Sequence, residues 1–280
     1  TGSTDGWGLI PDNTNGNLDF ARIGGGAGTY FRISNDGSLS TPTAGTSNVR
    51  FGVNAGNSIA SGGNYNTVVG DEAGTAISTG DENTFLGYAA GDANTTGNNN
   101  TAVGHNSLST NILSDHNVAI GNDALATHNT GSSIDAYNVA VGSGAGFAVT
   151  TGKQNTFIGG NAGDANTTAD NNTAVGYNSL TANTTGARNS ALGSSALQAN
   201  TTGNYNVAFG FQSLQTSTTG THNTALGDAA LSASTTASNN TAVGQSALFA
   251  NTTGDRNVAV GSGAADSLTT GAANTAIGYK

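Results

Sequence analysis

Hydrophobic and polar positions recur with a fixed period along most of the chain. The recurring segment is Asn-x-x-x-Gly, and it occurs fourteen times. The step between successive copies is 17, except for one step of 18 from Asn48 to Asn66 and one step of 21 from Asn117 to Asn138. A period this short predicts a solenoid with one coil per repeat. The fourteen asparagines are Asn48, Asn66, Asn83, Asn100, Asn117, Asn138, Asn155, Asn172, Asn189, Asn206, Asn223, Asn240, Asn257 and Asn274.

The residues after each asparagine, which is position one of the repeat, predict a short strand. Positions two and four often carry β-branched or large apolar residues such as Val118 and Ile120, position three is usually Ala, and position five is Gly. Because side chains alternate across a strand, positions two and four share one face. We expect that face to line the interior and the small opposite face to contact another subunit, since small residues allow close backbone approach. The predicted subunit-contact residues are Ala102, Gly104, Ala174, Gly176, Ala242 and Gly244.

A second apolar position, position nine, predicts a second short strand in each repeat. It holds Leu in seven copies and Gly or Ala in others, which predicts thinner cores in those coils. The Thr-Thr-Gly segment that follows has the composition of a turn and is expected to close the coil. No apolar stripe of helical spacing is sustained. The seven leucines are Leu108, Leu125, Leu180, Leu197, Leu214, Leu231 and Leu248.

The chain divides at the start of the repeats. Residues 1–47 are richer in aromatic side chains, and we predict a small β-rich N-terminal cap with strands at 18–23 and 29–34 around the glycine run at 24–28. Residues 48–280 form the predicted repeat domain. Within it, the step of 21 predicts a four-residue insertion near 132–135.

Composition narrows the function classes. The 280 residues contain no Cys and no Met, which excludes disulfides and thiolate chemistry, and only 9% of residues are charged. The net charge of −10 argues against binding to nucleic acid or anionic lipid. No apolar stretch is long enough for membrane insertion. The regular spacing of the apolar residues argues for an ordered chain despite the low complexity.

No arrangement of residues predicts catalysis, a metal site or a cofactor. The glycine run at 24–28 lacks the following Lys-Ser/Thr of a phosphate-binding loop. The four histidines have no recurring partner at a ligand spacing, so we interpret them as interchangeable surface residues. The densest acidic cluster, Asp71, Glu72, Asp81 and Glu82, is interpreted as a solvated edge. The histidines are His105, His116, His128 and His222.

One variable position is the candidate recognition surface. The residue before each asparagine, position 17 of the repeat, changes from copy to copy on an otherwise constant scaffold, and its aromatic members suit contact with sugar rings. Solvent-facing variation without a function is the competing interpretation, and the predicted inserted loop is a second candidate. The candidate recognition residues are Tyr65, His116, Tyr137, Arg188, Tyr205, His222 and Arg256.

The unit from Asn48 to Gly52 and its thirteen later copies resemble the head repeats of trimeric autotransporter adhesins. Similar repeats occur in phage and viral tail fibres. The resemblance covers roughly residues 48–280 and implies a left-handed parallel β-roll of which three chains pack side by side. With the repeat count, the expected fold is an all-β parallel β-solenoid of about 14 coils, as a homotrimer with an N-terminal cap.

The expected function is that of a non-enzymatic extracellular fibre protein, on a cell surface or a virion, that attaches to a host cell or another surface. Expected partners are further copies of the chain and a cell-surface glycan or protein receptor, with no nucleic acid and no cofactor. The alternative is a purely structural shaft or filament subunit. A third hypothesis, an ice-binding solenoid, rests on Thr67, Thr84 and Thr101 in register. The predicted inward orientation of these threonines argues against it.

Overall fold

A computed structural model describes residues 6–12, 17–23, 29–33, 39–40 and 44–280. Four strands precede the repeats and form an antiparallel sheet in sequence order: β1 (Gly6–Asp12), β2 (Asn17–Ile23), β3 (Thr29–Ile33) and β4 (Leu39–Ser40). The two strands predicted in this region are confirmed as β2 and β3. The glycine run predicted as the turn between them lies outside the described residues. The role of this sheet as a cap stays a prediction.

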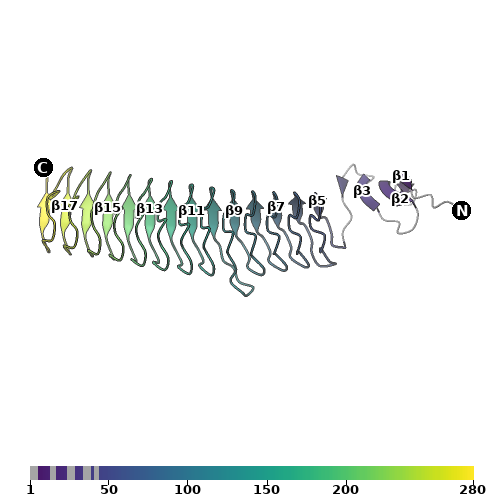
Figure 1. Cartoon of the computed structure of the whole chain (residues 1–280), viewed down its shortest axis with the longest axis horizontal. Helices are drawn as coiled ribbons and strands as arrows, with labels where there is room; N and C mark the ends of the chain where they lie inside the picture. Colours follow the sequence, from purple (N-terminus) through teal and green to yellow (C-terminus); the bar gives the residue numbers. More distant parts are fainter. Residues whose placement is uncertain (1–5, 13–16, 24–28, 34–38, 41–43) are drawn as a thin grey trace.

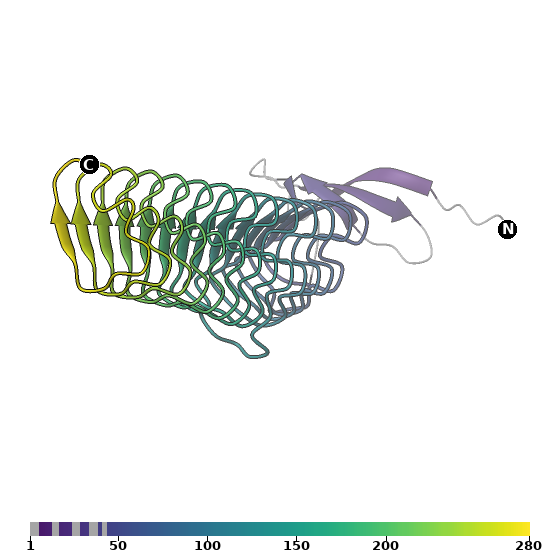
Figure 2. The ribbon, with the colours of Figure 1, turned by 60° about the vertical axis from the view of Figure 1, so that its left-hand side comes forward.

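The repeats form a parallel β-solenoid, as predicted. Each of the fourteen asparagines is followed by a three-residue strand, and the strands pair in parallel and in sequence order (Figures 1 and 2). Equivalent positions face one another, as in Val175 opposite Leu192 and Leu192 opposite Phe209. The strands are β5 (Val49–Phe51), β6 (Thr67–Val69), β7 (Thr84–Leu86), β8 (Thr101–Val103), β9 (Val118–Ile120), β10 (Val139–Val141), β11 (Thr156–Ile158), β12 (Thr173–Val175), β13 (Ser190–Leu192), β14 (Val207–Phe209), β15 (Thr224–Leu226), β16 (Thr241–Val243), β17 (Val258–Val260) and β18 (Thr275–Ile277).

The two faces of the strands are oriented opposite to the prediction. Position three is buried inside the coil in β6 to β17, so Ala102, Ala174 and Ala242 belong to the core and cannot form a subunit-contact face. Positions two and four point outward. The reason is volume: a coil of this size is already filled by the leucine at position nine, and only a small residue fits opposite it.

The glycines at position five are also explained within one chain. Gly104, Gly176 and Gly244 adopt φ values of 127°, 137° and 129°, a backbone region that L-residues rarely occupy. A Cβ atom on Gly176 would lie 2.6 Å from the carbonyl carbon of Gly193 in the next coil. These glycines therefore turn the corner after each strand and allow close stacking of coils, and their repetition needs no second subunit.

The second predicted strand is wrong, because the segment around position nine is a series of turns. Leu108 and Leu180 adopt left-handed φ values of 52° and 53°, and the residues two positions before them are left-handed as well. An extended strand cannot contain such residues. The leucine side chains are nevertheless fully buried, and backbone bonds join the turns of adjacent coils, as from Leu108 N to Ala124 O at 2.9 Å.

Two of the coils without leucine at position nine keep a filled core, so the predicted thinning is wrong for these two. In both of them position three is Phe instead of Ala, and the ring occupies the leucine's place. A Cβ atom on Gly91 would lie 2.6 Å from the ring of Phe85, and one on Gly163 would lie 2.4 Å from the ring of Phe157. Large and small residues therefore exchange places between two positions of the same coil.

The position-one asparagines form a buried ladder along the stack. The backbone N–H of Asn189 donates to Oδ1 of Asn172 at 2.9 Å, and Nδ2 of Asn172 donates to the carbonyl of Gly186 at 2.9 Å. Each amide thus joins its own coil to the next one. Buried polar groups must be paired, and the amide side chain of asparagine supplies both the donor and the acceptor needed here.

The longest coil, between β9 and β10, protrudes from the stack at the place of the predicted insertion (Figure 1). Its tip, from Gly131 to Ser133, is exposed. The chain rejoins the stack through a parallel bridge between Asp115 and Asp135. The loop is therefore an excursion from an otherwise continuous stack.

Candidate binding surfaces of the solenoid

The outer face of the parallel sheet, formed by positions two and four of β5 to β18, carries a continuous row of apolar residues at position four, and we call it the apolar sheet face. Position four is Val, Leu, Ile or Phe in every strand, and position two is Thr, Val or Ser. Neither position carries a charge, and the face runs for about 65 Å if strands are about 4.8 Å apart. Single soluble chains rarely expose an apolar area of this extent. The more exposed large residues on it are Phe51, Leu86, Ile120, Ile158, Leu192, Phe209, Leu226, Val258, Val260 and Ile277.

The threonines considered for ice binding lie on this outer face. Thr67 and Thr101 are partly exposed and Thr84 is exposed. The expectation that position two faces inward is therefore wrong, and the objection based on it no longer holds. Val118 and Val139 interrupt the row of threonines in the same register.

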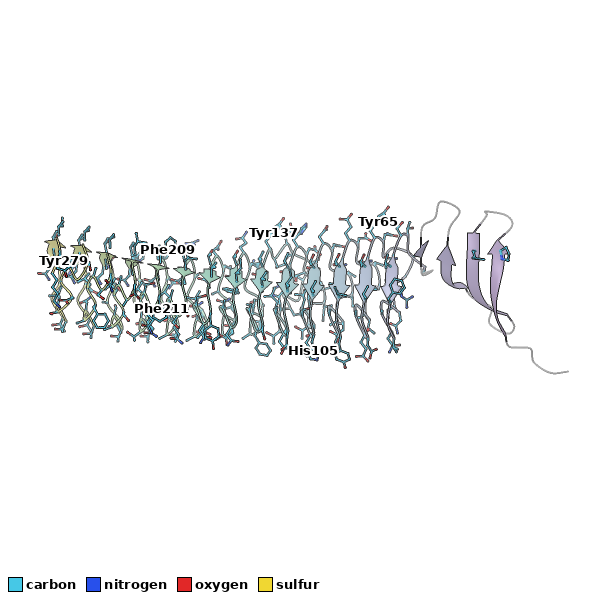
Figure 3. All side chains as sticks on the ribbon, turned by 90° about the horizontal axis from the view of Figure 1, so that it is seen from above. Tyr65, His105, Tyr137, Phe209, Phe211 and Tyr279 are labelled. Atoms are coloured by element: carbon cyan, nitrogen blue, oxygen red, sulfur yellow. The ribbon has the colours of Figure 1, made fainter. Side chains whose placement is uncertain are left out.

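The candidate recognition residues before each asparagine are all exposed, as expected of a recognition surface. Their backbones share a left-handed conformation, with φ of 58° at Tyr65 and 59° at Tyr205. In Figure 3, Tyr65 and Tyr137 project from the same side of the row of strands as Phe209. We call the residues directly before the position-one asparagines, these candidates and their counterparts in the other coils, the position-17 column. It borders the apolar sheet face.

Several members of this column contact one another. The rings of His116 and Tyr137 lie 5.0 Å apart, and those of Tyr205 and His222 are stacked at 4.8 Å. The guanidinium carbon of Arg188 lies 5.3 Å from the centre of the Tyr205 ring. The structure thus gathers the candidates into two groups in different coils, while Tyr65 and Arg256 lie in coils away from both.

The protruding loop contributes to the first group through Asp135. Its Oδ1 atom lies 2.9 Å from Nδ1 of His116, and the hydroxyl of Tyr137 donates to its Oδ2 at 3.1 Å. The hydrogen bond to the Asp135 carboxylate raises the pKa of Tyr137. These contacts attach the end of the loop to the column, so the two predicted candidates form one surface there.

His128 differs from the other histidines and corrects the prediction that all four lie on the surface. Its side chain is fully buried, with Nε2 3.1 Å from the hydroxyl of Ser114. Burial lowers its pKa to about 4, because the interior disfavours the charged ring. The equivalent position, position twelve, holds a buried Asn in several coils, such as Asn111 and Asn166. The place of His128 in the repeat was therefore a sequence signal for its burial.

A second variable column was not predicted. The residue directly after the position-five glycine is exposed at Tyr88, Tyr177 and Phe211, and His105 stacks on Tyr88 with ring centres 5.3 Å apart. His105 and Phe211 lie on the other side of the row of strands from Tyr65 (Figure 3). The residue type at this position varies between coils, as it does at position 17. The same criterion could therefore have identified this second column from the sequence.

The described residues contain no group of three His, Cys, Asp or Glu side chains placed to hold a metal ion. In the same part of the chain, no helix has the length and apolarity required to cross a bilayer. Comparison with protein-family models, with curated proteins and with solved structures yields no match. Inference about function therefore rests on the solenoid and on its three exposed features: the apolar sheet face and the two variable columns.

Proposed function

We propose that the chain is a non-enzymatic extracellular fibre protein, on a cell surface or a virion, that attaches to a host cell or another surface as a side-by-side homotrimer. The apolar sheet face is the observation that carries this proposal. The three chains meet through these faces, which leaves the column of Tyr88, Tyr177 and Phe211 exposed. The number three comes from the resemblance to trimeric adhesin heads.

Burial of the sheet face provides the driving force for association. Each exposed Leu, Ile or Phe at position four contributes about 25 cal/mol for every Å² of apolar surface that it loses to the interface. The contribution of one coil is small, but the same position recurs in fourteen strands on a rigid scaffold. A face that is uncharged along its whole length also avoids burying unpaired charges in the interface.

The molar mass in solution tests the association. The chain has a mass of 27.4 kDa, and we expect sedimentation equilibrium to give three times that value. Leu192→Asp with Leu226→Asp places carboxylates in the interface and should dissociate the trimer, with the circular dichroism spectrum retained. Tyr177→Asp with Phe211→Asp is the matched control on the other side and should remain trimeric. A monomeric wild-type chain would contradict the proposed assembly.

Attachment itself requires a separate test. We expect the labelled wild-type chain to bind saturably to intact cells or to an immobilised glycan array, and the Leu192→Asp, Leu226→Asp variant to bind more weakly because it loses multivalency. A trimer that binds no cell and no glycan would favour the alternative function of a structural shaft.

Ice binding is a second candidate, favoured by the outward orientation of the position-two threonines such as Thr67 and Thr84. A regular outer row of Thr is available only if the sheet face is free of a partner. A trimer that buries this face should show no thermal hysteresis in a nanolitre osmometer. Thermal hysteresis by a monomeric chain would replace the fibre proposal with this one.

A further inference from the structure

We propose that part of the position-17 column binds an acidic polysaccharide through the carboxylate groups of the glycan. This inference rests on the proposed attachment function and names the class of its ligand. The residues come from five successive coils and are here called the basic ladder. They are Arg188, Tyr205, His222, Asn239 and Arg256.

Charge distinguishes this stretch from the rest of the molecule. The whole chain has seventeen acidic and seven basic residues, yet the basic ladder contains two arginines and no carboxylate. The residues directly before its first four members are uncharged. The fifth is preceded by Asp255, which accepts a hydrogen bond from the backbone N–H of Ser238 at 2.7 Å. Asp170, which lies in the coil before Arg188, is held in the same way, by the backbone N–H of Lys153 at 2.7 Å. Within the column itself, an anionic ligand therefore meets two arginines and no carboxylate.

The packing within the ladder determines which contacts a ligand can make. Arg188 and His222 come from the two coils that flank Tyr205, and their side chains pack against its ring. Arg188 Nη1 also donates to the Tyr205 hydroxyl. With its ring covered by its neighbours, Tyr205 cannot serve as a stacking platform for a sugar. The ladder instead presents N–H and O–H donors, which match the acceptor oxygens of carboxylates.

The spacing of these donors is fixed by the scaffold. Backbone bonds tie the coils at this column, as from Tyr205 N to Ala187 O at 3.2 Å and from Arg256 N to Ser238 O at 3.1 Å. Arg188 and Arg256 are four coils apart, which corresponds to about 19 Å at a strand spacing of about 4.8 Å. A linear polymer with regularly repeated charges matches such a row. Because the scaffold already fixes the backbone positions, the protein loses little conformational entropy on binding.

A polysaccharide fits this surface better than a nucleic acid does. Nucleic acids carry a high density of phosphate charge, and proteins that bind them neutralise many phosphates with Lys and Arg. Two arginines on a chain with a net charge of −10 cannot do so. A polyuronate has fewer charges and many hydroxyl groups, which Asn239 and the Tyr205 hydroxyl can also contact.

The test measures binding of the full chain to polygalacturonate, with neutral dextran and single-stranded DNA as comparison ligands. We expect polygalacturonate to bind, to bind more weakly as salt is added, and to lose at least about tenfold in affinity in the Arg188→Gln, Arg256→Gln variant. Lys153→Gln removes a partly exposed basic residue outside the ladder and should change affinity less than about twofold, because this charge contacts no ligand.

Three results would overturn the assignment: no binding of polygalacturonate by the wild-type chain, equal affinity of the Arg188→Gln, Arg256→Gln variant, or tighter binding of DNA. A change in the molar mass of that variant would also overturn it, because the ladder would then belong to the subunit interface. If the wild-type chain is trimeric and attaches to cells without binding polygalacturonate, only the ladder assignment fails. If it neither forms trimers nor attaches to cells, the proposed function fails.

Discussion

The asparagine that begins each coil uses both the oxygen and the nitrogen of its side-chain amide in hydrogen bonds. In the coil of Asn172, Oδ1 accepts from the backbone N–H of Asn189, and Nδ2 donates to the carbonyl of Gly186. Removal of this side chain leaves the buried backbone N–H of Asn189 without a partner, whereas the Gly186 carbonyl still accepts a hydrogen bond from Nδ2 of Asn183 at 2.9 Å. An orphaned buried group costs about 1–3 kcal/mol.

The neighbouring residues Asn171 and Asn172 allow a matched comparison, because the first is exposed and the second is buried. We expect Asn172→Ala to lower the free energy of unfolding by roughly 1–3 kcal/mol, and Asn171→Gly, which suits the left-handed φ of 62° at that residue, by less than about 0.5 kcal/mol. Urea denaturation at a fixed protein concentration measures both. Equal effects would show that the ladder contributes little to stability.

His128 is expected to make stability depend on pH. Its folded pKa of about 4 lies below the ordinary value of 6.5, so the unfolded state binds the proton more readily. The stability that the neutral ring contributes is complete above pH 6.5 and is lost as the pH falls toward 4. The shift corresponds to roughly 3 kcal/mol.

The variant His128→Asn places in this coil the residue found at the same position in other coils, such as Asn111. The difference in unfolding free energy between wild type and variant should fall by roughly 3 kcal/mol from pH 7 to pH 4, to the disadvantage of the wild type. Urea titrations at a series of pH values measure this difference. A difference that is constant with pH would mean that His128 is not kept neutral by burial.

At the scale of the element, the side chains at positions three and nine together fill the fixed interior volume of one coil. The coil of Phe157 and Gly163 and the next coil, with Ala174 and Leu180, fill that volume in two different ways. Gly163 and Leu180 have nearly the same backbone conformation, with φ of 57° and 53°, so the backbone permits the exchange.

A double-mutant cycle tests this exchange. Phe157→Ala should lower the unfolding free energy by roughly 3–5 kcal/mol through a cavity, and Gly163→Leu by roughly 1–3 kcal/mol through overpacking. The double variant reproduces the composition of the next coil and should lie within about 1 kcal/mol of wild type. Additive losses in the double variant would contradict a shared volume.

At the scale of the whole molecule, the solenoid is a one-dimensional stack in which each coil bonds only to its neighbours. Removal of one complete repeat, the segment 189–205, joins Arg188 to Asn206 and restores the register. We expect this shortened chain to unfold in a cooperative thermal transition within about 5 °C of the full chain, because only one of many similar interfaces is lost.

Removal of the longer segment 189–213, which ends in the middle of a repeat, is the matched control. It joins Arg188 to Leu214 and leaves one coil without its strand. Circular dichroism during heating should show a markedly lower or non-cooperative transition for this chain alone. Equal melting of the two deletions would contradict a stack that depends on complete coils.

Much of the fold could be predicted because the same residue types recur at fixed spacing. The asparagine and glycine of each repeat indicated where the strands begin and end, and β2 and β3 were recognisable from the turn-forming residue types that flank them in the sequence. The orientation of the strands was predicted wrongly, since Val and Ile at positions two and four are more apolar than Ala at position three. Residues that cover a partner and residues that fill a core have the same composition, and alternation alone does not distinguish them.

The candidate surfaces were predictable in part for a similar reason. Variation at an otherwise constant spacing identified the exposed position-17 column, but the contacts of Tyr205 with Arg188 and His222 depend on the distance between coils, which the sequence does not state. His128 was assigned to the surface together with the other three histidines, although it lies at position twelve, where other coils carry a buried Asn such as Asn111.

The sequence by itself determined the architecture: a short, constant period can be satisfied only by coils that stack in register, because the buried amide of each asparagine needs its counterpart in the next coil. The tertiary structure alone decided which side of each strand faces the interior. That choice depends on the interior volume that the side chain at position nine leaves free. Position nine lies further along the chain, in a series of turns outside the strand. Closure of the coil brings the two positions together, and this closure places the Val, Leu, Ile and Phe side chains of position four on the outside.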